Sequence, residues 1–315
     1  TSGIRSYTAI YGMNPVPRAT VLDTIQKHPF DFAPGERFLY NNSGYYLLGV
    51  ILEAVTGVPY ADYVEERLFE PLGMTSTSYC GWGGEELPVG YAPDEGRLSR
   101  AVLSDMSFPG AAGGLCSTVD DLLTWQHALV SGRVVRPATY ARMTTPATLA
   151  SGEAMSYGYG LMEGELEGRP RIAHGGGIPG YNTFLSYYPE EELAVVVLVN
   201  TAPGHAGRVE EPVARAALGL PRRVIADLPL SVAERARYVG TYELPRLQVR
   251  VFERDGVLMA QATGQGALAM KYQGEQTFLL DAPQEIRLVF ELEGEGGARF
   301  TLHQNGAAVQ AERIR

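Results

Sequence analysis

The stretch PGERFLYNNSGY, residues 34–45, predicts the entry into a buried helix. The apolar residues that recur at helical spacing define the face that we expect to be buried: Tyr45, Leu48, Ile51, Leu52 and Val55. Gly57 stands at the C-cap position and Pro59 follows it, so the helix should end there. The stretch therefore sets a tight junction, with Tyr40 and Asn42 just before or within the first helical turn.

Tyr40 and Asn42 lie two residues apart at this junction. A phenol can carry a proton and an amide side chain can hydrogen-bond a substrate, so we interpret the two as lining a cleft. The alternative is that Tyr40 is a packed aromatic residue whose hydroxyl finds an ordinary partner.

A second segment, AHGGGIPGY at residues 173–181, is rich in glycine. Gly175, Gly176 and Gly177 would let the backbone pass close to a ligand with its amides free to donate, as an oxyanion site requires. His174 is the candidate for contact with a substrate carboxylate or for proton transfer. The alternative is a glycine-rich turn with a half-buried histidine beside it.

The first 228 residues mix helical and strand patterns, which predicts an α/β or α+β domain. Residues 183–188 and 193–199 predict a hairpin whose second strand is buried on both faces. Ser117-Thr118-Val119-Asp120 predicts a capping box, with Ser117 as the N-cap of a helix that ends at Gly132.

The pattern changes from about Leu228, and residues 229–315 predict a second domain. Short stretches of alternating polarity predict seven or eight strands, at residues 247–252, 257–262, 268–272, 277–280, 286–290, 299–302 and 307–311. Turn signals such as Asp255-Gly256 separate them. The domain is therefore expected to be a small antiparallel barrel or sandwich.

Composition narrows the class of protein. The 315 residues carry a formal net charge of −10 and are 45% hydrophobic, which excludes a disordered chain and argues against sequence-independent nucleic-acid binding. No apolar run reaches the 18 or more residues of a membrane span. The chain opens at Thr1 without a signal-peptide pattern, and we expect its natural N-terminus to be missing, so both periplasmic or secreted and cytoplasmic locations stay open.

Cysteine, histidine and lysine are few. Cys80 and Cys116 make no disulfide framework, and whether they pair is left open, with Cys116 interpreted as a small buried apolar residue. No zinc-ligand spacing is present, so neither a metal nor a cofactor is predicted. The chain contains two lysines, Lys27 and Lys271, as candidates for lysine-dependent chemistry.

Together the two segments resemble the serine β-lactamase-like family, which includes class C β-lactamases, D,D-peptidases, D-aminopeptidases and family VIII esterases. Tyr40-Asn41-Asn42 matches its Tyr-x-Asn motif, and His174-Gly175-Gly176 matches its third motif in the His-x-Gly form. Further strings look like family landmarks: residues 1–4, 71–74, 112–118 and 157–161, the last interpreted as structural. Tyr238-Val239-Gly240-Thr241-Tyr242 is similar to a lipocalin-like C-terminal domain of some relatives.

The resemblance implies a penicillin-binding-protein-like fold and a role for each motif residue. Tyr40 would be the general base, Asn42 and His174 would contact substrate, and the Gly177 amide would form half of the oxyanion hole. The family's nucleophile lies in a Ser-x-x-Lys motif, which occurs nowhere in the 315 residues. Thr24-Ile25-Gln26-Lys27 is the nearest string, in an expected surface helix.

The resulting prediction is a serine hydrolase that forms an acyl-enzyme with a peptide, D-amino-acid-containing or ester substrate. The nucleophile would belong to a missing N-terminal portion or to a separate N-terminal fragment of the same protein. One alternative is a non-catalytic module that binds peptide or peptidoglycan. Another is that the terminal barrel closes the cleft or mediates oligomer formation.

Overall fold

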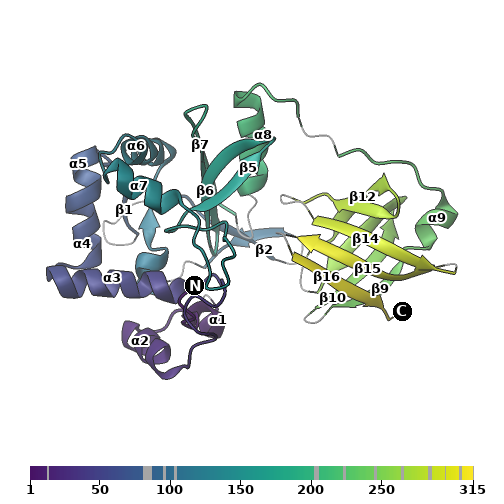
Figure 1. The fold of residues 1–315 in the computed structure, drawn as a ribbon, viewed down its shortest axis with the longest axis horizontal. Coiled ribbons are helices and arrows are strands. Elements are labelled where there is room, and N and C mark those ends of the chain that lie inside the picture. Colours follow the sequence, from purple (N-terminus) through teal and green to yellow (C-terminus); the bar gives the residue numbers. More distant parts are fainter. Residues whose placement is uncertain are drawn as a thin grey trace. The chain divides into compact units, whose positions relative to one another are not determined.

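The computed structural model describes the whole chain except residues 13, 81–86, 95–96, 103–104, 202–205, 223–224, 245–246, 264–265, 283–285, 295, 305–306 and 315. The described residues form two compact units, Thr1–Leu218 and Gly219–Arg315 (Figure 1). The first unit mixes helices and sheets and the second contains a closed antiparallel barrel, which confirms the expected fold class. The domain boundary at residue 228 stays a prediction.

The first unit contains most of the helices. Its helices are α1 (Tyr7–Tyr11), α2 (Arg18–Lys27), α3 (Asn42–Thr56), α4 (Tyr60–Val64), the π-helical η1 (Glu65–Phe69), α5 (Glu70–Leu72), the 3-10 helix η2 (Gly110–Ala112), α6 (Val119–Val130), α7 (Pro137–Thr144) and α8 (Ala206–Ala217). Its strands are β1 (Ser78–Tyr79), β2 (Tyr91–Asp94), β3 (Arg97–Arg100), β4 (Leu115–Cys116), β5 (Met162–Leu166), β6 (Arg169–Ile178), β7 (Tyr181–Tyr188) and β8 (Leu193–Val199).

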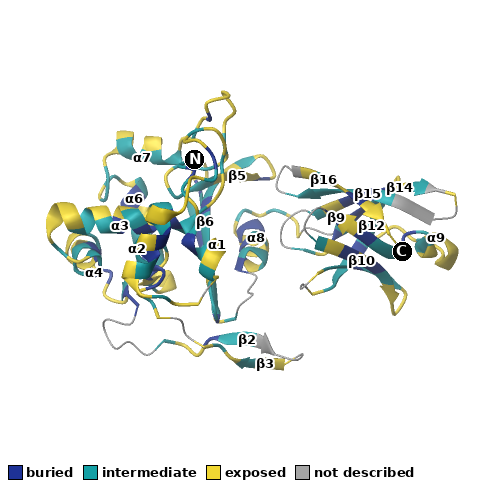
Figure 2. Ribbon diagram, turned by 90° about the horizontal axis from the view of Figure 1, so that it is seen from below, coloured by how far each residue is buried: buried dark blue, intermediate teal, exposed yellow. Residues whose placement is uncertain are grey.

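A four-stranded antiparallel sheet in the order β5-β6-β7-β8 is the centre of this unit. Helix α8 packs on β7 and β8, and Figures 1 and 2 show it on the opposite side of the sheet from α3 and α4. The hairpin of β7 and β8 is confirmed, but the burial expected for β8 is wrong. Val195 and Val197, which share the face of Ser186 toward α8, are buried, while Leu198 on the other face is exposed.

Helix α3 begins and ends as expected, but its buried face differs from the prediction. Asn41 caps it by accepting a hydrogen bond from the Gly44 amide (2.9 Å), and Gly57 ends it in the left-handed conformation with φ 71°. The buried positions are Ser43, Tyr46 and Gly49.

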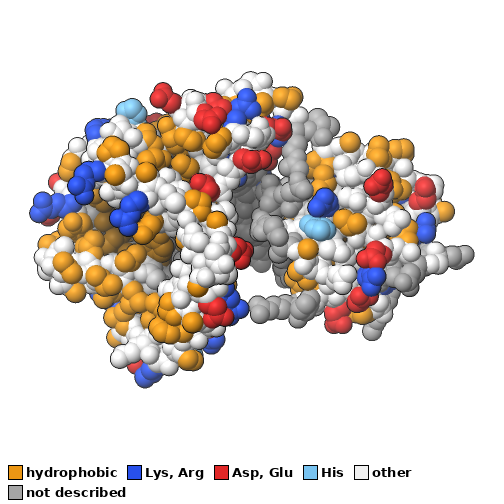
Figure 3. All heavy atoms as spheres, in the orientation of Figure 1, with side chains coloured by type: hydrophobic (Ala, Val, Ile, Leu, Met, Phe, Trp, Pro, Cys, Tyr) orange, Lys and Arg blue, Asp and Glu red, His pale blue; other side chains and the backbone are white. Residues whose placement is uncertain are grey.

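The expected apolar face of α3 is largely exposed: Leu48 and Ile51 are each 56% exposed and Val55 is 80% exposed. A Cβ added to Gly49 would lie 2.5 Å from the Ala111 Cβ, so glycine lets η2 approach the backbone closely and turns the small-residue face inward. Figure 3 shows hydrophobic side chains gathered over the area where α3 lies in Figure 1. No single described helix is long and apolar enough to cross a membrane; α3 and the segment Tyr60–Leu72, bent by 84°, pass that test only as a pair.

Two local predictions need correction between β1 and α6. The N-cap of α6 is Thr118, which accepts a hydrogen bond from the Asp121 amide (3.3 Å). The helix itself runs to Val130, and Gly132 beyond its C-cap is left-handed with φ 79°, as the expected end requires. Ser117 is not the cap because its hydroxyl pairs with that of Thr77 (2.7 Å). Cys116 is not a free apolar residue but forms a disulfide with Cys80, which joins the ends of the paired strands β1 and β4.

The second unit is a short helix, α9 (Val232–Ala236), followed by the barrel. Its strands are β9 (Gly240–Leu244), β10 (Leu247–Arg254), β11 (Val257–Ala262), β12 (Leu268–Gly274), β13 (Thr277–Leu280), β14 (Ile286–Glu293), β15 (Gly296–Gln304) and β16 (Ala307–Arg313). They close in sequence order through β16 and β9, which confirms the barrel. Asp255 and Gly256 both have positive φ, as the predicted hairpin turn requires.

Aromatic side chains fill the interior of this barrel. Tyr242, Phe278, Phe290 and Phe300 are all buried, and their rings contact one another or a neighbour at centroid distances of 4.8 to 5.6 Å. The closed barrel therefore has a complete core of its own.

Candidate active site

The sheet of the first unit places His174 and the glycines on strand β6. Side chains alternate between the faces of a strand, so Arg171 and Ala173 share one face and His174 the other. Ala173 pairs with Ser186, whose hydroxyl reaches Glu210 of α8, and this defines the α8 face of the sheet. His174 therefore belongs to the opposite face, which we call the His174 face.

Tyr40 reaches the His174 face from the segment before α3. Its ring centroid lies 6.2 Å from that of His174, and the Tyr40 side chain is half exposed. The structure thus brings together Tyr40 and His174, the two residues that the sequence analysis gave catalytic roles. The local reason is the Asn41 cap, which fixes where the chain leaves Tyr40 and enters the helix.

Tyr157 is a third member of this cluster, and the sequence analysis treated it only as structural. Its hydroxyl lies 2.9 Å from His174 Nε2, and its ring packs against those of Tyr40 and Phe38 at centroid distances of 6.1 and 5.4 Å. The string Tyr157-Gly158-Tyr159-Gly160-Leu161 marks this segment in the sequence, but it does not predict a contact between Tyr157 and His174.

His174 uses both of its ring nitrogens. Nδ1 lies 2.6 Å from the carbonyl oxygen of Gly175, and Nε2 faces the Tyr157 hydroxyl. Burial lowers the pKa of His174 below its ordinary value, and the contact with the Gly175 carbonyl opposes that shift. Burial without a charged partner thus favours a neutral imidazole.

The glycines of the third motif lie within β6, so the alternative of a glycine-rich turn is wrong. Gly175, Gly176 and Gly177 pair with Phe184, Thr183 and Asn182 of β7, and the turn comes later, at Gly180. Strand β5 pairs with β6 only as far as Ala173. Beyond that residue one edge of β6 has no partner strand among the described residues, so alternate backbone amides there are directed away from β7.

Side chains of β7 lie close to the glycine backbone of β6. A Cβ added to Gly176 would lie 2.8 Å from the Thr183 hydroxyl, and one added to Gly177 would lie 3.3 Å from Asn182 Nδ2. The Asn182 amide donates to the Gly176 carbonyl (3.0 Å) and accepts from the Ala206 amide (2.8 Å). Asn182 thus connects the glycine strand to the start of α8.

Asn42 lies in the first turn of α3, but its recorded contacts are with α1. Its Nδ2 donates to the Thr8 hydroxyl (3.0 Å), and its backbone amide donates to the Ser6 hydroxyl (3.3 Å). Its side-chain oxygen keeps the capacity to accept a hydrogen bond. No recorded contact joins Asn42 to His174, and its role as a substrate contact stays a prediction.

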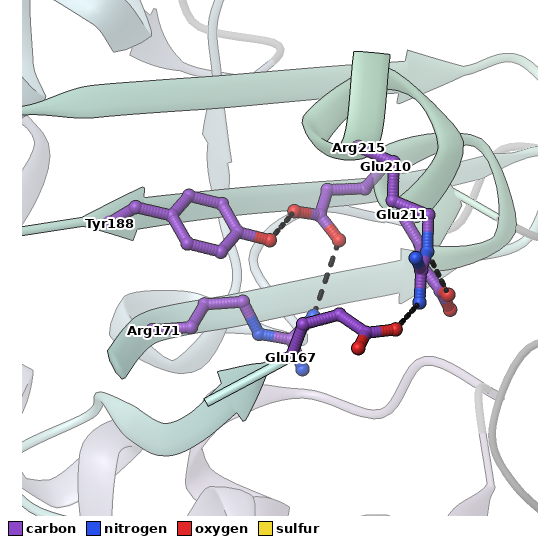
Figure 4. Close-up of polar contacts among 6 residues, drawn as sticks. All are labelled: Glu167, Arg171, Tyr188, Glu210, Glu211 and Arg215. Carbon is purple, nitrogen blue, oxygen red and sulfur yellow. Dashed lines mark hydrogen bonds and ion pairs between the residues drawn. The ribbon is translucent and has the colours of Figure 1, made fainter. Parts of the chain in front are cut away.

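The opposite face of the sheet holds a buried ionic cluster (Figure 4). Glu210 of α8 is fully buried and accepts hydrogen bonds from Ser186 (2.5 Å), Tyr188 (2.8 Å) and Arg171 (3.3 Å). Burial, and secondarily the Glu210 charge, raise the pKa of Tyr188 to about 12. Arg215 pairs with Glu167 and Glu211 beside this cluster, which ties α8 to the turn between β5 and β6.

Each of the two lysines has an acidic partner within its own unit. Lys27 pairs with Asp23 on the surface of α2, and Lys271 pairs with Asp227 in the second unit. Burial raises the pKa of Tyr40 above its ordinary value. Among the described residues no three His, Cys, Asp or Glu side chains are grouped in a way that could hold a metal ion.

Curated relatives of the chain are peptidases and penicillin-binding proteins. The D-aminopeptidase of Gluconobacter oxydans (strain 621H) is 28% identical over 232 residues, 70% of this chain and 43% of that protein. Penicillin-binding protein 4* of Bacillus subtilis (strain 168) is 26% identical over 315 residues, 90% of this chain and 68% of that protein. The chain thus spans less than half of the D-aminopeptidase that it matches.

Solved structures extend the likeness to the fold. A D-stereospecific amidohydrolase from Streptomyces sp. is 28% identical, with a TM-score of 0.56 and coverage of 64% of this chain and 65% of its own. The octameric penicillin-binding protein homologue from Pyrococcus abyssi covers 98% of this chain and 76% of its own, with a TM-score of 0.63 at 24% identity. At 24% identity the likeness to the Pyrococcus abyssi protein concerns the fold alone. The barrel of the present chain fits a lipocalin-like domain.

The family profile named beta-lactamase matches residues 1–220, which contain the whole of the first unit with Tyr40, Tyr157 and His174. The chain belongs to the beta-lactamase family of serine hydrolases.

Proposed function

We propose that residues 1–220 hold the proton-handling and substrate-binding groups of a serine hydrolase that forms an acyl-enzyme. The observation that carries the proposal is the meeting of Tyr40 and His174 on one face of the sheet, beside the glycines of β6 whose edge is free of β5. A phenol, an imidazole and directed backbone amides are the groups that acyl transfer uses.

Each group has one role in this proposal. Tyr40 takes the proton from the attacking hydroxyl and returns it to the leaving group. The Gly177 amide stabilises the oxyanion, with Gly175 and Gly176 giving the strand its close approach. Asn42 contacts the substrate, and so does His174 together with the Tyr157 hydroxyl that faces its Nε2. The substrate class is a peptide, a D-amino-acid-containing amide or an ester, which is supported by relatives named D-aminopeptidase and D-stereospecific amidohydrolase.

The nucleophile comes from outside these 315 residues in this proposal, because no Ser-x-x-Lys occurs among them. A lysine ammonium beside the site would also lower the pKa of Tyr40, which burial now raises, and would so make the phenol a better base. The exposed apolar face of α3, a helix that begins two residues after Tyr40, is a surface for the segment that carries such a motif.

The test is hydrolysis of D- and L-amino acid p-nitroanilides by residues 1–315, alone and with the Ser-x-x-Lys segment, either fused or added as a separate polypeptide. We expect turnover only with the segment present, faster for the D-substrates, and lost on changing its serine to alanine. Absence of turnover on all these substrates and on short esters with the segment present would overturn the proposal.

A second candidate is a non-catalytic module that binds peptide or peptidoglycan fragments, and the absence of Ser-x-x-Lys from the sequence favours it. Calorimetric titration of residues 1–315 with a peptide that ends in D-Ala-D-Ala separates the two. Binding that is lost in His174→Ala, combined with no turnover when the segment is present, would favour the module. Roles of the barrel as a lid or in oligomer formation stay predictions.

A further inference from the structure

Tyr157 sits on a fixed backbone between α7 and β5. Its carbonyl accepts a hydrogen bond from the Ala147 amide (3.0 Å), and Tyr157 forms a β-bridge with Met162. A Cβ on Gly158 would clash with the Met143 carbonyl oxygen, so glycine at that position lets the chain pass directly against the end of α7. These contacts therefore fix the backbone from which the Tyr157 side chain extends.

The hydrogen bonds of His174 define which nitrogen carries the proton. The Gly175 carbonyl can only accept, so Nδ1, at 2.6 Å, must be the N–H donor. Nε2 of the neutral ring is then an acceptor, and the Tyr157 hydroxyl, at 2.9 Å, must donate to it. No described Asp, Glu, Lys or Arg side chain makes a recorded ion pair or hydrogen bond with His174, and the titratable rings that contact it are Tyr40 and Tyr157.

We propose that Tyr157 is a positioning residue that holds His174 as the neutral Nδ1–H tautomer and occupies its Nε2. This proposal concerns the site of the proposed function. Its kinetic consequence rests on that function, whereas the tautomer of His174 does not. Neither ring nitrogen of His174 is free to donate to a substrate carboxylate in this arrangement. The polar atom that the pair keeps available is Tyr157 Oη, whose remaining lone pair accepts, so the pair suits a substrate N–H better than a carboxylate.

The first test needs no enzyme activity. Two-bond ¹H–¹⁵N correlation spectra of residues 1–315 labelled with ¹⁵N-histidine report the tautomer of each imidazole between pH 5 and 8. The signals of His174 are assigned as those that disappear in His174→Gln. We expect the neutral ring of the unsubstituted chain to carry its proton on Nδ1, and a neutral form dominated by Nε2–H in the wild type would overturn the proposal.

The matched variants are Tyr157→Phe and Tyr159→Phe, since Tyr159 lies in the same loop and is 63% exposed. Loss of one neutral hydrogen bond should lower the ratio of Nδ1–H to Nε2–H tautomer about twofold to tenfold in Tyr157→Phe. The pKa of His174 should also change there, because the hydroxyl donates to the neutral ring and can accept from the protonated one, and both bonds are lost. An unchanged tautomer and pKa in a folded Tyr157→Phe would overturn the proposal, and Tyr159→Phe should match the wild type.

The kinetic consequence is tested with the Ser-x-x-Lys segment present. Tyr157→Phe should shift the acid limb of kcat/KM, and Tyr159→Phe should leave it in place. An unmoved limb in an active Tyr157→Phe variant would contradict the positioning role. Absence of turnover in every variant, the wild type included, would instead count against the proposed function and leave the tautomer result to decide this proposal.

Discussion

The two faces of the β5–β8 sheet differ in the charge of the polar side chains that they hold. On the α8 face the buried carboxylate of Glu210 has three hydrogen-bond donors, and Arg171 supplies the balancing charge. On the His174 face Tyr40, Tyr157 and His174 meet through rings and one side-chain hydrogen bond, without a recorded ion pair. The first face holds α8 to the sheet, whereas the second holds uncharged groups that can exchange protons.

This difference indicates that the α8 face contributes mainly to stability and the His174 face mainly to activity. A charge buried with its partners is costly to disrupt, so the α8 face should respond to substitution by unfolding. Uncharged, half-exposed groups add little to folding, so the His174 face should respond in activity and pH dependence. The predictions below test this separation of roles.

Glu210→Ala should produce the largest effect. Removing the carboxylate leaves Arg171 partly buried without its partner, and breaking a buried pair in this way costs about 3 to 5 kcal/mol of unfolding free energy. Urea unfolding followed by tryptophan fluorescence is the measurement, because both tryptophans lie within the first 218 residues. The control is Glu165→Ala in β5, an exposed carboxylate expected to change stability by about 0.5 kcal/mol or less. Equal effects of the two variants would contradict the assignment of stability to the α8 face.

Tyr40→Phe should have the next largest effect, and on activity alone. With the Ser-x-x-Lys segment present, loss of the proton carrier should reduce turnover by about 10² or more. Steady-state hydrolysis of a D-amino acid p-nitroanilide measures it, and urea unfolding of the same variant should match the wild type. Wild-type turnover in Tyr40→Phe would remove the general-base role.

Ser186→Ala should have a smaller effect on stability than Glu210→Ala. It removes one donor to the carboxylate while Tyr188 and Arg171 remain, and a hydrogen bond to a charged group contributes about 1.5 to 3 kcal/mol. The same urea unfolding experiment applies. A loss as large as that of Glu210→Ala would show that the three donors act as a single unit, which would sharpen the picture of this face.

The smallest expected effect is the contribution of His174 to the pH dependence of stability. Burial lowers its folded-state pKa below the ordinary value of 6.5, so the unfolded chain binds a proton first as the pH falls. Stability from this group is therefore fully present above pH 6.5 and is lost as the pH falls toward the folded-state pKa. Unfolding free energies between pH 7.5 and about 5 should decline less steeply in His174→Gln than in the wild type. A steeper decline of the unfolding free energy in His174→Gln than in the wild type would mean that the folded state favours the charged imidazole.

The barrel could be predicted from the sequence almost strand by strand because its signals are local. Alternating polarity marks each strand, and residues such as Asp255-Gly256 supply the positive φ of a tight turn. The two expected boundaries of β11, Val257 and Ala262, are those observed. The end of helix α3 could be predicted for the same reason, from Gly57 at its C-cap, whereas its N-cap, Asn41, was not predicted.

What the sequence did not reveal depends on contacts between distant segments. The exposed face of α3 contradicts the rule that apolar faces are buried, because Gly49 and Ala111 bring η2 onto the small-residue face. Tyr40 and His174 were identified by their motifs, but the Tyr157 contact joins two segments without any shared local pattern. The sequence does not determine whether Cys80 and Cys116 pair, because the disulfide depends on the pairing of β1 with β4 rather than on the spacing of the cysteines.

The central claim is that this chain holds the proton-handling groups of a serine hydrolase while its nucleophile lies elsewhere. The most direct measurement is the intact mass of the 34.2 kDa chain after incubation with a fluorophosphonate, alone and with the Ser-x-x-Lys segment. The account predicts no adduct on residues 1–315 in either sample and one stoichiometric adduct on the segment in the second. A stoichiometric adduct on a residue of this chain would contradict it.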